Sequence, residues 1–150
     1  MCISLEIRHA NLSDALAISE LVQNVAHHCL GTDASAFVST ISPAAIEDHI
    51  QNPGYSYVLG LFGNELVGVA AMRDNKHFYH LFVVPQHQHK GIAKLLWHSL
   101  KAHAVTMGTN VFTVNSSLYA VPVYEKFGFS ASSEPQSRNG INYVPMQLSV

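Results

Sequence analysis

The residues from Gln88 to Ala93 have the types and spacing of a loop that binds phosphate. They read Gln-His-Lys-Gly-Ile-Ala, after an apolar stretch typical of a strand and before an amphipathic helix. Gly91 and Ala93 stand where larger side chains would block a phosphate from the unpaired N–H groups at the helix start. The first helical turn also carries partial positive charge. Because neither GxGxxG nor a Gly-Lys-Ser/Thr loop is present, the sequence predicts an anionic cofactor other than those that these two loops bind.

A second block of polar and aromatic residues begins at Asn115. It reads Asn-x4-Ala-x3-Tyr-x3-Gly-Phe and ends at Phe129. The separation of the two blocks suits one βαβ crossover, which needs about 30 residues or more. Together the blocks resemble motifs of the GNAT superfamily of acetyl-CoA-dependent N-acetyltransferases, whose pyrophosphate loop reads Gln/Arg-x-x-Gly-x-Gly/Ala. The likeness extends over most of the chain.

The resemblance implies that acetyl-CoA is the cosubstrate and that main-chain amides hold it. The loop amides belong to Gln88, His89, Lys90, Gly91, Ile92 and Ala93. Lys90 or Lys94 would neutralise phosphate charge, although both lysines also suit a solvated helix face. The resemblance places Asn115 beside the cofactor, where it would orient it; a plain turn residue is the alternative.

The resemblance also implies two parallel strands that pair and then separate, leaving main-chain groups free to receive the pantetheine arm like an added strand. These strands correspond to residues 81–84 and 111–114. An amide near Phe82 would face the thioester oxygen, and amides at Val83 and Val84 would contact the arm.

Acyl transfer from a thioester requires a proton for the leaving thiolate, and Tyr124 is the candidate donor. A tyrosine of pKa about 10 keeps its proton at neutral pH, whereas a thiol has a pKa of about 8.5. The GNAT resemblance implies a tyrosine at this point, beside the CoA sulfur. The alternative is a tyrosine anchored in the core near Phe127 and Phe129.

The acceptor amine must lose a proton, and histidines are the available bases. At pH 7 a primary amine of pKa about 10.4 is neutral in about one molecule in 2,000. Some superfamily members use a glutamate on the fourth strand, but residues 77–84 contain no carboxylate. We interpret His80 as the candidate base, with His77 or another polar strand residue as the alternative.

Hydrophobic periodicity predicts the elements that position these residues. The first predicted helix begins after Ser13, which is able to cap it, and ends at Gly31. The other predicted helices run from Pro43 to Gln51, from Ile92 to about Met107, and from Ala120 to Phe127. The predicted strands are residues 5–9, 55–61, 66–72, 77–84, 110–114 and 141–148, with one more strand before a hairpin turn at Asn139-Gly140.

The order β-α-α-β-β-β-α-β-α-β-β predicts a single α+β domain over residues 1–150. With the resemblance, we expect a GNAT-like mixed sheet of about seven strands and about four helices, with splayed central parallel strands. The acceptor pocket would be built by residues 31–51 and the hairpin at Arg138. Small and polar residues there indicate no strong charge preference. Glu47-Asp48 would attract a cation or simply form a solvated helix face.

Composition excludes several other function classes. A net charge of −2 with 12% charged residues gives no basic surface for nucleic acid and no polybasic strip for a membrane. No apolar run approaches the roughly 20 residues of a spanning helix, and the N-terminus lacks a secretion signal, so we expect a cytoplasmic protein. The ten histidines lack metal-ligand spacing, so no metal site is expected.

These observations predict an N-acetyltransferase that moves the acetyl group of acetyl-CoA to a primary amine of a small molecule or peptide. Attack would be direct, because neither cysteine lies near a motif to form an acyl-enzyme. A non-catalytic acyl-CoA-binding module is the alternative. The sequence leaves open whether the protein is a monomer or a homodimer.

Overall fold

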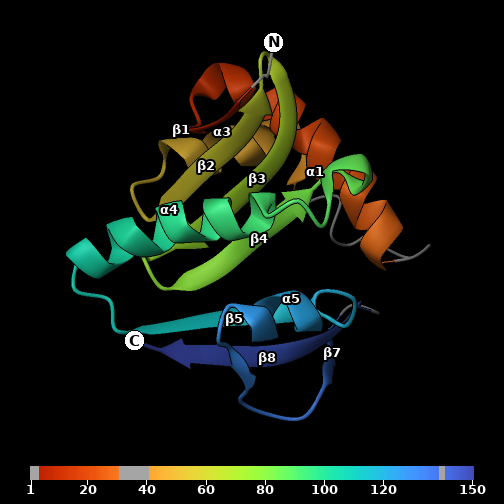
Figure 1. The fold of residues 1–150 in the computed structure, drawn as a ribbon. Helices are drawn as coiled ribbons and strands as arrows, with labels where there is room; N and C mark the ends of the chain where they lie inside the picture. The colour runs from red at the N-terminus through yellow and green to blue at the C-terminus, as the bar shows by residue number, and fades with distance from the viewer. Residues whose placement is uncertain (1–3, 31–40, 139–140) are drawn as a thin grey trace.

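A mixed β-sheet forms the centre of the molecule, in a computed structural model that describes residues 4–30, 41–138 and 141–150. Its strand order is β1-β2-β3-β4-β5-β8-β6, with β7 paired to β8 (Figure 1). The strands are β1 (Leu5–His9), β2 (Tyr55–Phe62), β3 (Glu65–Arg73), β4 (His77–Val83), β5 (Val111–Ser117), β6 (Ser130–Ala131), β7 (Gln136–Arg138) and β8 (Ile141–Ser149).

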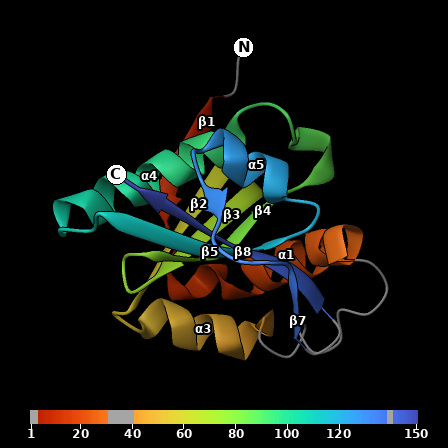
Figure 2. The same ribbon diagram turned by 90° about the horizontal axis from the view of Figure 1, so that it is seen from below.

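Helices cover both faces of the sheet. Seen from below in Figure 2, α4 and α5 lie on one face, and α1 and α3 lie on the other. Their bounds are α1 (Ala15–Leu30), α3 (Pro43–Gln51), α4 (Ile92–Thr106) and α5 (Val121–Lys126); two short 3-10 turns, η1 (Leu12–Asp14) and η3 (Pro85–His87), precede α1 and α4. The expected α+β fold is confirmed.

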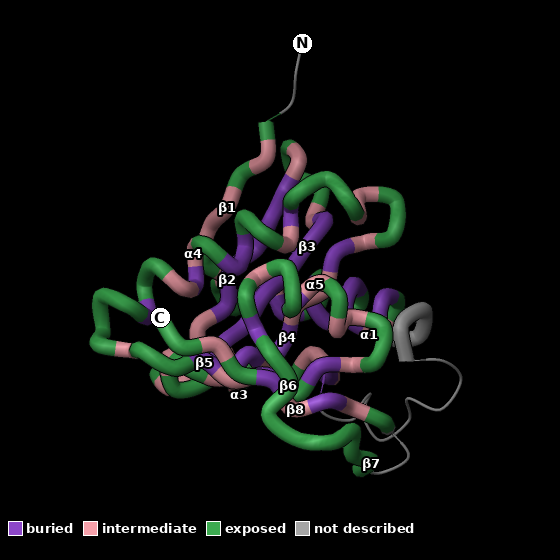
Figure 3. The backbone as a smooth tube through the Cα atoms, turned by 60° about the horizontal axis from the view of Figure 1, so that its bottom comes forward, coloured by how far each residue is buried: buried purple, intermediate pink, exposed green. Residues whose placement is uncertain are grey.

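Each face of the sheet has its own apolar core. The core under α1 and α3 includes Ile18, Val22 and Leu59, all fully buried. The core under α4 includes Leu96 and Trp97. Figure 3 shows this burial running through the central strands, while the loops at the surface stay exposed.

The start of α1 differs from the expectation. Asn11, rather than Ser13, is the cap: its side chain accepts from the Ser13 amide at 3.0 Å, and Asp14 accepts from the Asn11 amide at 2.8 Å. This reciprocal arrangement satisfies free donors at the helix start. Ser42 caps α3 as predicted, accepting from the Ala45 amide at 3.2 Å.

Strands β2, β3 and β4 are consecutive and antiparallel, as predicted. Gly68 in β3 lets α4 approach this sheet closely, because a Cβ atom there would lie 3.1 Å from Leu96 Cδ1 and 3.3 Å from Ile92 Cγ2. The first turn of α4 is thereby held against the strand beside the splayed edge.

The C-terminal part of the sheet is more extended than expected. β5 continues to Ser117 because it pairs with β8 as far as Ser117↔Tyr143, so Asn115 lies within the strand. Residues 130–138 form two short strands, both paired to β8, instead of one. The sheet of the described residues therefore has eight strands rather than about seven. The hairpin turn predicted at 139–140 and the segment 31–40 lie outside the described residues.

Candidate active site

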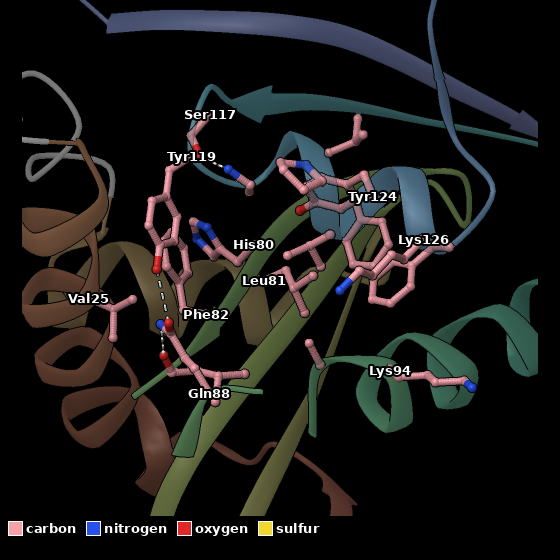
Figure 4. A pocket seen from close by; sticks show the side chains of 18 of the residues that line it. Val25, His80, Leu81, Phe82, Gln88, Lys94, Ser117, Tyr119, Tyr124 and Lys126 are labelled. Atoms are coloured by element: carbon pink, nitrogen blue, oxygen red, sulfur yellow. Dashed lines mark hydrogen bonds between the residues drawn. The ribbon is translucent and has the colours of Figure 1, made fainter. Parts of the chain in front are cut away.

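A pocket of about 930 Å³ opens where β4 and β5 separate. β4 and β5 pair in parallel only at His77↔Thr113 and Phe78↔Val114. Beyond these residues β4 stays with β3 and β5 stays with β8, so the two strands diverge. Figure 4 shows the pocket, which is lined by β4, the start of α4, β5, α5, the β7–β8 hairpin and Val25 of α1. The strands therefore splay, as the sequence resemblance implied, although on β5 the separated residues are 115–117.

A bulge in β4 contributes to this divergence. The pairing of β3 with β4 shifts between Ala71↔His80 and Met72↔Phe78, which leaves Tyr79 as an extra residue. A bulge bends its strand and interrupts pairing. It also turns Tyr79 and His80 toward the α1 side of the sheet, whereas Phe78 packs in the α4 core.

The main-chain groups that face the pocket are those of Leu81 and Val83, which corrects the expectation for Phe82 and Val84. The Val84 amide donates to the Val67 carbonyl of β3 at 2.9 Å. Because donors alternate along an antiparallel strand, the Phe82 amide points to β3 as well. The carbonyl of Val83 points to the open side, where it accepts from Gln88 Nε2 at 2.9 Å. Of the three residues named from the sequence, Phe82 and Val83 line the pocket and Val84 does not.

The loop before α4 has the geometry of an anion site. Gly91 precedes the helix with a φ of 83°, and no side chain caps the first N–H groups. A Cβ atom at Gly91 would meet no atom within 4 Å, so space is open beside these donors. The N–H groups at the start of this 15-residue helix are thus available to a phosphate. His89, Gly91, Ile92 and Ala93 all line the pocket.

Lysines at the pocket differ in part from those expected. Lys94 lines the pocket, whereas Lys90 does not. Lys126 of α5, which sequence reasoning missed, also lines it. Figure 4 shows Lys94 and Lys126 at one end of the pocket and Val25 and Tyr119 at the other. Two cations therefore flank the end near the helix start.

Gln88 and Tyr119 form a hydrogen bond across the pocket. The Tyr119 hydroxyl donates to Gln88 Oε1 at 3.1 Å, while Gln88 Nε2 donates to the Val83 carbonyl (Figure 4). Gln88 belongs to the loop after β4, and Tyr119 to the turn after β5. Tyr119 lines the pocket, although the sequence did not single it out. It falls at an unspecified position of the block from Asn115 to Phe129, so the motif gave no signal of this contact.

Tyr124 lies at the pocket wall with its ring in the core. The side chain is 6% exposed and packs edge-on against Phe78 and Phe129, with ring centroids 5.5 and 5.7 Å away. Burial raises the pKa of its hydroxyl, which therefore keeps its proton at neutral pH. Tyr124 is thus anchored in the core and also lines the pocket, while its role as a proton donor stays a prediction.

His80 lines the same pocket in a buried position. It is 2% exposed and packs beside Tyr79 and Tyr57, with ring centroids 4.3 and 6.0 Å away. Burial, with a smaller effect of His49, lowers the pKa of His80 to about 3. The imidazole is therefore neutral at pH 7, and it is a weaker base than the sequence interpretation assumed. His77, the other candidate base, is held by Thr113 Oγ1 at 2.8 Å from its Nδ1 and does not line the pocket.

The wall made by β5 and the β7–β8 hairpin is polar. Asn115 lines the pocket together with residues that sequence reasoning did not single out as cofactor or catalytic groups: Ser117, Arg138, Asn142 and Tyr143. Tyr143 donates to Gln136 Oε1 at 3.0 Å. The register of β8 against β5 and β7 brings these residues together, so no short motif could reveal them.

No helix among the described residues is long and apolar enough to cross a membrane. Among the same residues, no group of three or more His, Cys, Asp or Glu side chains is arranged to hold a metal ion.

The fold of this chain is shared with solved acetyltransferases. The GCN5-related N-acetyltransferase from Rhodopseudomonas palustris, also described as a class-II aminotransferase, matches with a TM-score of 0.83 at 19% identity, over 100% of this chain and 99% of that chain. PaiA N-acetyltransferase from Thermoplasma acidophilum, solved in complex with coenzyme A, matches with a TM-score of 0.85 at 17% identity, over 98% and 99%. The ribosomal-protein-S18-alanine N-acetyltransferase from Escherichia coli matches with a TM-score of 0.72 at 16% identity, over 97% and 94%.

The sequence itself matches a family model described as an acetyltransferase (GNAT) domain over residues 20–150. The chain belongs to this GNAT acetyltransferase family. No curated protein matches it in sequence.

Proposed function

We propose that this protein transfers the acetyl group of acetyl-CoA to a primary amine of a small molecule or peptide, by direct attack of the amine. The observation that carries the proposal is the single pocket that joins the uncapped start of α4 to Tyr124 and His80. An anion site, an open strand edge and a buried proton donor in one pocket are what transfer from a CoA thioester requires.

Acetyl-CoA supplies the acetyl group as a thioester. In this proposal the N–H groups at the start of α4 bind its pyrophosphate, with Lys94 and Lys126 balancing the phosphate charge. The main-chain groups of Leu81 and Val83, at the open edge of β4, form hydrogen bonds with the pantetheine arm as they would with an adjacent strand. Asn115, at the pocket wall on β5, orients the same arm.

The Leu81 amide is the proposed donor to the thioester oxygen. It points into the space that β5 vacates, so the sheet holds it in place before the substrates arrive. A preorganised amide of this kind contributes about 3 kcal/mol to transition-state stabilisation.

Tyr124 is the proposed acid for the leaving thiolate. Its raised pKa keeps the phenol protonated, and its hydroxyl belongs to a side chain at the pocket wall. The proton passes from Tyr124 to the sulfur as the C–S bond breaks.

His80 is the proposed contact for the acceptor amine. Because its imidazole is neutral, one ring nitrogen is able to accept a hydrogen bond from an amine that is itself neutral. Because the pKa of His80 is low, its imidazole does not retain the proton that the amine loses, and this proton passes on to solvent.

A non-catalytic acyl-CoA-binding module remains the second candidate, because the anion site and the open edge serve binding alone. The pocket-lining Tyr124 and His80 favour the enzyme.

A thiol-release assay with acetyl-CoA tests the proposal. The panel contains amino acids, simple amines, polyamines, aminoglycosides and peptides with free N-termini, and each rate is compared with hydrolysis without amine. We expect release well above hydrolysis with at least one class. Thermal stabilisation by acetyl-CoA without release in any class would instead identify the binding module.

A further inference from the structure

The charges that line the pocket are of one sign. Arg138, Lys94 and Lys126 line it, and no aspartate or glutamate does among the described residues. Glu47 and Asp48, which the sequence offered as attractors of a cation, lie exposed on α3 and do not reach the pocket. The expectation of no strong charge preference referred to residues 31–51 and the hairpin at Arg138, of which 31–40 and 139–140 lie outside the described residues, and it stays a prediction.

Arg138 lies on a different wall from the two lysines. It belongs to β7 and is paired with Ile141 of β8, whereas Lys94 and Lys126 belong to α4 and α5. Arg138 shares a strand face with Gln136, which is two residues away and is hydrogen-bonded to Tyr143. Tyr143 is in turn the register partner of Ser117 on β5. Arg138 therefore belongs to the polar wall that β7 and β8 form, not to the helices that carry the two lysines.

The guanidinium of Arg138 forms no ion pair in the part of the chain that the structure describes. The ion pairs there are Arg8–Asp14 at 2.9 Å and Arg73–Asp74 at 3.9 Å. The guanidinium of an exposed arginine at a pocket wall, with no carboxylate paired to it, is able to bind a ligand carboxylate by donating two parallel hydrogen bonds.

This arrangement discriminates between acceptor amines. A polyamine or an aminoglycoside brings several ammonium groups, which Arg138 repels and no described carboxylate binds. Arg138 also lowers the pKa of an ammonium group near it and so favours the neutral, reactive amine. An acceptor that carries its own carboxylate offsets this repulsion.

We propose that the acceptor is a primary amine that carries a carboxylate in the same molecule, as a free amino acid does, and that Arg138 binds this carboxylate. The inference rests on the proposed acetyl transfer. Lys94 and Lys126 remain with the phosphates of the cosubstrate, so the two ends of the pocket bind two different anions.

The test compares free amino acids with their carboxamides, in which the carboxylate is replaced by a neutral group. Thiol release gives kcat/KM for each pair with the unchanged protein and with Arg138→Gln. Taking the ratio between the two proteins for each acceptor cancels the different intrinsic reactivity of an amino acid and its amide. Lys126→Gln is the matched control, because it removes a pocket-lining cation that belongs to α5 instead of β7.

We expect Arg138→Gln to lower kcat/KM for the amino acid by about 10-fold or more, with a change within about twofold for the amide. KM for acetyl-CoA should stay the same, and Arg138→Lys should recover part of the loss. Lys126→Gln should instead raise KM for acetyl-CoA and leave the preference for the carboxylate intact.

Efficient acetylation of polyamines, or equal losses for amino acid and amide in Arg138→Gln, would overturn this inference while leaving acetyl transfer established. Absence of thiol release with every amine would overturn both proposals.

Discussion

At the scale of single residues, the pocket combines two buried groups whose environments keep them neutral. Burial raises the pKa of Tyr124 and lowers the pKa of His80 to about 3. At neutral pH the protonated phenol of Tyr124 and the neutral imidazole of His80 therefore line the same pocket. In the proposed reaction, Tyr124 delivers the proton to the thiolate and His80 contacts the amine.

The environment of His80 also predicts how stability depends on pH. The pKa is about 3 in the folded protein and about 6.5 in the unfolded chain, so the unfolded chain binds a proton that the folded protein does not. Unfolding free energy should therefore fall as pH is lowered from about 6.5 toward 3, by about 1.4 kcal/mol per pH unit from this residue. Burial of His77 acts in the same direction.

Urea unfolding at a series of pH values measures this slope. In His80→Gln the unfolding free energy should depend less steeply on pH between about pH 6 and pH 4, by about 1.4 kcal/mol per pH unit, which corresponds to one proton. The contribution of His80 is then lost, and that of His77 is retained. An identical slope in the unchanged protein and in His80→Gln would show that His80 has the same pKa in the folded and unfolded states.

At the scale of elements, much of the framework could be predicted from sequence. Alternation of apolar residues located β1, apolar runs between turn residues located β2 to β4, and Ser42-Pro43 located the start of α3, because these signals are local. The strand edge could not be located, because which amides of β4 face the pocket depends on the pairing of Val84 with Val67. Arg138 and Tyr143 enter the site through the register of β8, which no local pattern determines.

The hydrogen bond between Gln88 and Tyr119 predicts an effect on cosubstrate binding. Gln88 Nε2 donates a hydrogen bond to the Val83 carbonyl. In the proposed complex, an amide of the pantetheine arm donates to the same carbonyl at the open edge of β4. Tyr119 holds Gln88 in that position. Tyr119→Phe removes one hydrogen bond that binding must break, so the Kd for CoA should fall by about 2- to 10-fold.

Calorimetric titration with CoA measures this change. Tyr143→Phe is the matched control, because its hydroxyl also donates to a glutamine, Gln136, but away from β4. Its Kd for CoA should be unchanged. A higher Kd in Tyr119→Phe would mean that Tyr119 contacts the cosubstrate instead of competing with it.

At the scale of the whole molecule, one sheet carries two different halves. β1 to β4 form a continuous antiparallel unit between α4 and the α1–α3 pair, while β5 to β8 form a second unit with α5. The halves share only two register pairs between β4 and β5. The opening between them is therefore a property of the topology, and it places residues from distant parts of the chain around one pocket.

The central claim is that this pocket performs acetyl transfer with Tyr124 as the acid for the leaving thiolate, and does not only bind acyl-CoA. Tyr124→Phe tests it most directly, because the substitution removes one oxygen and retains the ring that packs against Phe78 and Phe129. With the best acceptor of the panel, we expect thiol release to lose about 10²-fold or more in kcat while the Kd for CoA stays within about twofold. Unchanged turnover in Tyr124→Phe would contradict the account, because the proton of the leaving thiol would then come from elsewhere.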